Sequence, residues 1–114
     1  MLDVIVPGGF NAKTGVGWKR NKRNTAWRYR NPSGLDSIVR IRIRGRRKTP
    51  GWLKFVVIGQ NGAYPMSPKR MPAKGTMVID SPLARTGQCG EALFSVAPAP
   101  SCVFKAHGRT LICK

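Results

Sequence analysis

The chain has 114 residues, of which 21 are Lys or Arg and 4 are Asp or Glu, so its formal net charge is +17. This charge implies an anionic partner: nucleic acid, an acidic polysaccharide, lipopolysaccharide or an anionic membrane surface. No apolar run approaches the roughly 18 residues of a membrane span, and the length favours a single domain comprising residues 1–114.

The N-terminal region predicts one strand followed by a turn-rich stretch. Residues 2–6 are apolar and are stopped by Pro7, which suits the end of a first strand. This region lacks the basic start and the long apolar segment of a secretory signal, so none is predicted here. The basic residues lie mainly in the first half, because residues 1–57 carry 14 of the 21.

Two stretches alternate between apolar and basic side chains, which is the pattern of half-buried β-strands. Residues 25–30 place Trp27 and Tyr29 on one face and arginines on the other, and residues 38–44 do the same with Val39, Ile41 and Ile43. Residues 31–34 (NPSG) predict the turn between them. If the two strands pair, one face of the sheet carries Arg28, Arg30, Arg40, Arg42 and Arg44.

The rest of the chain predicts short strands separated by turns, with no sustained helical period. After a basic turn at residues 46–51, strands are expected at 52–59, 75–80, 91–96, 101–106 and 109–114. The last two form a hairpin around the two-residue turn His107-Gly108, and residues 52–59, the most apolar strand, should be central. Connections are expected at 60–63, 64–74, 81–87 and 97–100. The fold class is therefore all-β: an antiparallel sandwich, immunoglobulin-like or related, of about 7–9 short strands.

Three cysteines, Cys89, Cys102 and Cys113, allow one disulfide and leave one thiol. A two-residue turn at His107-Gly108 puts Cys102 opposite Cys113, where a hydrogen-bonded pair has Cα atoms about 5.5 Å apart. A bond between Cys89 and Cys102 is equally compatible with the sequence, as are three buried free thiols. No metal site and no cofactor are expected, because no C-x-x-C pair is present and the chain has one His.

The second half resembles uncharacterised β-rich proteins of myxobacteria and related proteobacteria that are predicted to be secreted. The resemblance is carried by residues 87–94 (GQCGEALF), 100–104 (PSCVF) and 108–114 (GRTLICK), and also by residues 52–55 (WLKF) and 59–65 (GQNGAYP). It covers residues 50–114 and implies an exported all-β module that tolerates disulfides. That group supplies no activity to carry over to this chain.

Catalysis is not expected from this sequence. The one enzyme-like set is Cys89, His107 and Asp80, since a Cys–His pair can form a thiolate nucleophile. The sequence around Cys89 matches no cysteine-protease signature, and His107 falls at a predicted hairpin tip. With four carboxylates in the chain, few groups are present to orient a base.

Two functions remain open after these exclusions. The first is a secreted or cell-surface structural and binding module whose basic sheet face binds acidic polymers or surfaces. Strand addition through an open edge, such as residues 2–6, would let such a module self-assemble. The second is a ribosome-, virion- or DNA-associated protein that contacts phosphates without sequence preference. Aromatic stacking would add to either if Trp18, Trp27 and Tyr29 were exposed. Both functions use the same candidate residues: Arg28, Arg30, Arg40, Arg42, Arg44, Arg46, Arg47 and Lys48.

Overall fold

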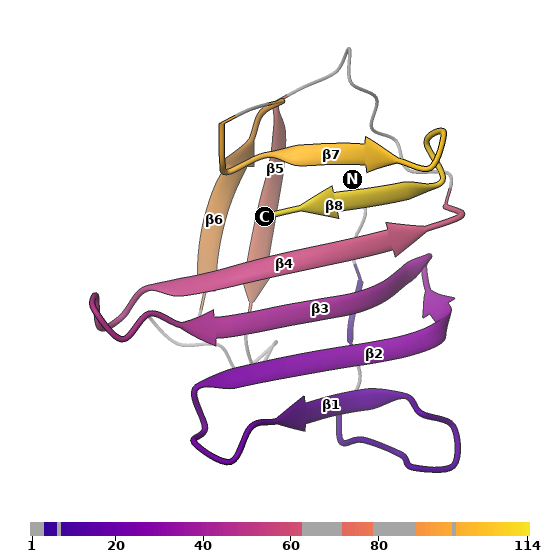
Figure 1. The fold of residues 1–114 in the computed structure, drawn as a ribbon, viewed down its shortest axis with the longest axis vertical. Coiled ribbons are helices and arrows are strands. Elements are labelled where there is room, and N and C mark those ends of the chain that lie inside the picture. The colour runs from indigo at the N-terminus through magenta and orange to yellow at the C-terminus, as the bar shows by residue number, and fades with distance from the viewer. Residues whose placement is uncertain (1–3, 7, 63–71, 79–88, 97) are drawn as a thin grey trace.

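The computed structural model describes residues 4–6, 8–62, 72–78, 89–96 and 98–114, and these contain strands but no helix. Six strands form one antiparallel sheet in the order β1-β2-β3-β4-β8-β7, and two form a separate hairpin, β5-β6 (Figure 1). The predicted all-β, sandwich-like class and number of strands are thus confirmed. The strands are β1 (Gly17–Arg20), β2 (Ala26–Leu35), β3 (Ile38–Gly45), β4 (Leu53–Gln60), β5 (Ala73–Val78), β6 (Cys89–Phe94), β7 (Cys102–Lys105) and β8 (Thr110–Cys113).

The pairing of β2 with β3 follows the alternation in the sequence. Tyr29 lies opposite Ile41 and Trp27 opposite Ile43, so the apolar side chains of both strands share one face. Strand β4 then pairs with β3 on one side and with β8 on the other. The most apolar strand is therefore internal, as predicted, and the C-terminal hairpin extends the sheet that the first half of the chain begins.

The turn between β2 and β3 lies later than the sequence predicted. The stretch 31–34 belongs to β2, and the pairing with β3 is interrupted between Arg30 and Leu35. This interruption tolerates Pro32, which has no N–H to donate to a partner strand. The reversal instead uses Asp36 and Ser37, both with positive φ, between the paired residues 35 and 38. Positive φ at both central residues gives the twist that two-residue hairpins favour.

The hairpin β5-β6 forms the second layer and crosses behind the large sheet in Figure 1. Phe94 of β6 is buried with Cys102, Leu111 and Cys113, and its ring meets Phe55 of β4 edge-on at a centroid distance of 5.8 Å. We call this group of residues the hairpin cluster. Its members from β4, β7 and β8 lie on the face of the large sheet that carries Tyr29 and Ile41, so the core occupies that one face.

A second group, the tyrosine cluster, is centred on Tyr29, which is fully buried with Ile38 and Ile41. Val4 and Val6 of the N-terminal segment pack against it. The strand predicted at residues 2–6 is not formed in its described part, residues 4–6, although these valines still serve the core. The next part of this segment crosses the edge of the sheet beside Gly17, where a Cβ atom would come 2.8 Å from Phe10 Cα.

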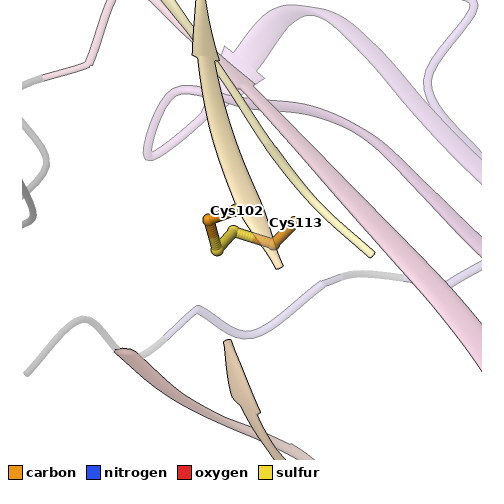
Figure 2. The surroundings of a disulfide bond; sticks show 2 residues. All are labelled: Cys102 and Cys113. Carbon is orange, nitrogen blue, oxygen red and sulfur yellow. A yellow bond between two sulfur atoms is a disulfide. The ribbon is translucent and has the colours of Figure 1, made fainter. Parts of the chain in front are cut away.

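The C-terminal hairpin has the predicted register and carries a disulfide between Cys102 and Cys113 (Figure 2). The expected Cα separation was wrong, because Ser101 and Lys114 exchange the two backbone hydrogen bonds. The cysteines therefore form the neighbouring non-hydrogen-bonded pair, whose Cα atoms lie 4.0 Å apart. The alternative bond from Cys89 to Cys102 is excluded, and Cys89 is a free, exposed thiol.

Candidate polyanion-binding face

The large sheet has a second face, opposite the core, which we call the outer face. Side chains alternate along a strand, so the neighbours of each core residue point to this face. In β3 the outward side chains are the arginines that alternate with Ile41 and Ile43. In β4 the outward side chains are those of the residues that alternate with Phe55 and Val57. The hairpin β5-β6 contacts the core side, and Figure 1 views the sheet from the outer side.

Seven cations gather on one half of the outer face, which we call the basic half. Arg28 lies directly opposite Arg42, and Arg30 lies opposite Arg40. Antiparallel pairs of this kind hold Cβ atoms about 5 Å apart, and residues two apart on one strand are separated by about 6.6 Å. The structure thus brings together the five arginines predicted to share a face and adds a lysine at each side. The basic half consists of Lys19, Arg28, Arg30, Arg40, Arg42, Arg44 and Lys54.

Acidic side chains of the described residues lie elsewhere. Asp36 is in the turn between β2 and β3, and Glu91 is on β6. The Glu91 carboxylate forms an ion pair with the Lys74 ammonium at 2.8 Å and accepts a hydrogen bond from the Thr76 hydroxyl. These contacts lower the pKa of Glu91 from its ordinary value of 4.5. Within the described ranges, the basic half therefore has no carboxylate partner, and its positive potential is left to solvent and ligands.

The turn after β3 adds three further cations at one end of the basic half. Arg46, Arg47 and Lys48 are exposed, and the Arg46 N–H donates to the Trp52 carbonyl at 3.0 Å, which closes the turn. A pocket of about 300 Å³ lies here. Its lining joins the turn to the sheet and consists of Thr25, Arg44, Gly45, Arg46, Arg47, Lys48 and Lys54. The eight predicted site residues therefore occupy one continuous region of β2, β3 and the turn.

The three aromatic residues considered for stacking, Trp18, Trp27 and Tyr29, do not share this face. Tyr29 is fully buried, and Trp18 packs on it with ring centroids 5.5 Å apart. Trp27 shares the core face and is 36% exposed at its margin. One cation–π contact borders the basic half, where the Lys19 ammonium lies 3.7 Å from the centroid of the Phe10 ring. The arginines of the face are accordingly arranged for contacts with anions rather than for stacking by these three aromatics.

The other half of the outer face carries an apolar group that sequence reasoning missed, bordered on the same face by Gln60, Thr110 and Lys105. Beyond β3, the row that contains Arg30 and Arg40 continues through Ile58, Ile112 and Val103. Val56 lies in the next row, opposite Arg42. Val103 is 40% exposed and the other three are partly buried, yet none belongs to either core cluster. We call these four residues the apolar half. The alternation of residues 53–58 was the available signal, but it does not reveal that β8 lies beside β4.

The enzyme-like residues are distributed over separate elements. Cys89 begins β6, His107 lies in the turn between β7 and β8, and Asp80 is outside the described residues. No group of three His, Cys, Asp or Glu in the described parts of the chain could hold a metal ion. Cys89 lines an open cleft of about 880 Å³, together with Trp52, Leu53 and Leu93, on the side of β4 that faces β6. This cleft lacks the dense cationic lining of the turn pocket.

The two free edges of the large sheet are short. Strands β1 and β7 have 4 residues each, and the Trp18 N–H of β1 donates outward to the Gly8 carbonyl at 3.1 Å. On β7 the Cys102 N–H is taken by the Ser95 carbonyl at 3.0 Å. Short and partly occupied edges limit pairing with another chain, so these two edges offer little template for strand addition.

Comparisons with known proteins do not assign a function to this chain. The described residues contain no apolar helix that is long enough to span a membrane. The resemblance of residues 50–114 to secreted β-rich proteins stays a prediction. Family models, curated proteins and solved structures were compared with the chain, and none of them matches it.

Proposed function

We propose that this protein is a non-enzymatic binding module that holds an acidic polymer or an anionic surface against the basic half of its outer face. One observation carries the proposal. Seven cations lie in adjacent cross-strand rows, and the described carboxylates lie on other elements. The exposed turn at Arg46, Arg47 and Lys48 extends this cationic region beyond the end of β3.

The energetics support a bound anion. Four like-charged pairs lie directly opposite each other in the sheet, and each such pair costs about 0.2–1 kcal/mol. They are Lys19 with Arg28, Arg28 with Arg42, Arg30 with Arg40, and Arg44 with Lys54. A polyanion converts this repulsion into charge-assisted hydrogen bonds, because guanidinium groups bind phosphate, sulfate and carboxylate in a forked geometry. The fold therefore carries a modest cost that a ligand would offset.

The disulfide supports a location outside the cytosol. Disulfides persist in oxidising compartments and are rare where glutathione keeps thiols reduced. The bond between Cys102 and Cys113 joins two buried residues of the hairpin cluster, so it belongs to the core. We infer a secreted or cell-surface module, in which the acidic partner is a polysaccharide, lipopolysaccharide or another anionic surface.

Nucleic acid is the second candidate partner, and the same cations favour it. Rows of arginines about 5 Å and 6.6 Å apart would meet successive phosphates without reading the bases. Such binding depends steeply on salt, since each phosphate contact releases a counterion. Because Trp18 and Tyr29 pack on each other in the core, stacked bases would find little support on this face.

A matched pair of charge variants tests the proposal. The triple substitution Arg40→Glu, Arg42→Glu and Arg44→Glu should abolish binding to heparin and to DNA at low salt. The control triple substitution carries the same charge change in exposed turns outside the face, at Lys13, Arg23 and Arg109. It should retain most of the affinity. Equal loss in both variants would show that net charge alone drives binding and would refute the assignment to this face.

Comparing ligands at matched salt then separates the two partner classes, because binding of any polyanion weakens with salt. For DNA, the slope of log K against log salt should fall by about 1 in the milder Arg42→Gln variant if this arginine contacts a phosphate. Comparing heparin, lipopolysaccharide and single-stranded DNA at one ionic strength ranks the partners directly. Tighter binding of DNA than of either other ligand under matched conditions would favour the second candidate.

A further inference from the structure

We propose that the outer face docks as a whole on the surface of an anionic phospholipid bilayer. This inference rests on the proposed function and names the partner of the same face. The basic half accounts for any polyanion, but the apolar half beside it does not contribute to binding a sugar or nucleic-acid polymer. A bilayer offers phosphate groups and an apolar layer in one plane, so it engages both halves together.

The two halves are continuous across the sheet. A single row of cross-strand neighbours begins with Arg30 and Arg40 and continues through Ile58, Ile112 and Val103. At about 4.8 Å between strands, this row spans roughly 19 Å from β2 to β7. Its first part is cationic and its second part is β-branched, so this row is amphipathic in the plane of the sheet.

Charge complementarity selects this occupant over a second copy of the chain. A copy placed on the apolar half would bring another +17 protein beside seven unneutralised cations. An anionic bilayer attracts the same cations, and each basic residue near its surface raises affinity about fivefold. Long arginine side chains reach headgroup phosphates while their stems lie along apolar surface. The short side chains of the apolar half then contact the boundary between headgroups and acyl chains.

Stable attachment to membranes generally takes two signals, for example a polybasic patch together with an inserted apolar group. The outer face supplies both without a lipid anchor. Val103 is the most exposed member of the apolar half and lies on the edge strand β7, where neighbouring side chains crowd it least. It is therefore the position where a change in apolar character should alter membrane affinity most with least effect on the core.

The test compares vesicles with soluble polyanions. Vesicles of phosphatidylglycerol and phosphatidylcholine are titrated with the protein beside heparin and single-stranded DNA at the same ionic strength, and vesicles of phosphatidylcholine alone are the neutral control. The double substitution Val103→Thr and Ile112→Thr keeps β-branched shapes. It should lower affinity for anionic vesicles about tenfold, since each CH₂ group buried in lipid is worth about fourfold. Affinity for heparin and DNA should stay unchanged.

A gain-of-function variant keeps the test decisive if the threonine variant folds poorly. Val103→Trp should raise affinity for anionic vesicles, because Trp favours the membrane interface, and should leave heparin affinity unchanged. Full vesicle affinity in the threonine variant together with no gain in the tryptophan variant would overturn the inference and leave the proposed function intact. If the Arg→Glu triple variant still binds every anion normally, the proposed function itself fails. A dimer that the threonine substitutions abolish would also overturn the inference, in favour of a second copy.

Discussion

Reversing one charge in the basic half should stabilise the fold while weakening ligand binding. Arg42 has Arg28 directly opposite it and Arg40 and Arg44 on the same face of its own strand. Two unit charges about 6 Å apart in water interact by about 0.7 kcal/mol, and reversing one charge changes each interaction by twice this value. Screening at 0.1 M salt roughly halves the effect, and similar repulsion in the unfolded chain removes a further part.

The expected gain for Arg42→Glu is therefore about 1 kcal/mol in the free energy of unfolding at about 0.1 M salt. For a domain of this size, this raises the melting temperature by about 4 °C. Thermal unfolding followed by circular dichroism measures the shift, and Arg42→Gln should give about half of it. At 1 M salt the Debye length falls to about 3 Å, so the gain should disappear.

The control for this experiment is Arg23→Glu, which makes the same change in net charge in the exposed turn between β1 and β2. It should raise the melting temperature by much less, because no arginine faces it across a ladder. The reasoning is refuted if both variants are stabilised equally, since the gain would then come from net charge rather than from the rows. It is also refuted if Arg42→Glu melts lower than the parent at low salt.

The remaining predictions concern the disulfide in the core, the chain crossing beside Gly17 and the carboxylate of Glu91. Substituting Cys102 and Cys113 together by Ala should cost about 3 kcal/mol in denaturant unfolding, as expected for a loop closed over a sequence separation of 11, while replacing the exposed free cysteine should change nothing. Gly17→Ala should cost about 3 kcal/mol or more, because its φ is +117° and the added Cβ would meet backbone atoms; Gly15→Ala, with φ of +71° and open space, should cost only about 1 kcal/mol. The pKa of Glu91 is lowered in the folded state, so its contribution to stability is complete above pH 4.5 and is lost as the pH falls through the folded value; Glu91→Gln should remove this acid-dependent part of the unfolding midpoint.

Local patterns were sufficient to predict the arginine rows. Strict alternation in residues 38–44 fixes which side chains share a face, and a slip of one residue would have moved Ile41 from the core to solvent. The β2–β3 turn was misplaced because residues 31–34 carry the usual turn residues, whereas Asp36 and Ser37 adopt positive φ without a glycine. Turn composition therefore gave the wrong position for the turn, because β2 continues beyond the point where its pairing with β3 is interrupted.

The apolar half was beyond local patterns for a different reason. Ile58 and Ile112 are directly paired although they are far apart in sequence, and nothing near either residue specifies that neighbour. Strand order between distant segments depends on how the whole core closes. The site could thus be predicted where it is built from one hairpin, and not where it depends on the meeting of the two halves of the chain.

Strand β4 has a role in cooperativity that follows from its two inward side chains. Phe55 packs against the hairpin cluster and Val57 against the tyrosine cluster, and among the described residues no other strand contributes to both. The two clusters are otherwise supported separately, one by the disulfide-linked hairpin and one by the N-terminal segment. Amide protons of the strands on the two sides of β4 will therefore exchange with solvent at the same cooperative opening event only while β4 stays paired in register with both neighbours. Once β4 separates from either neighbour, the two parts of the core lose stability independently.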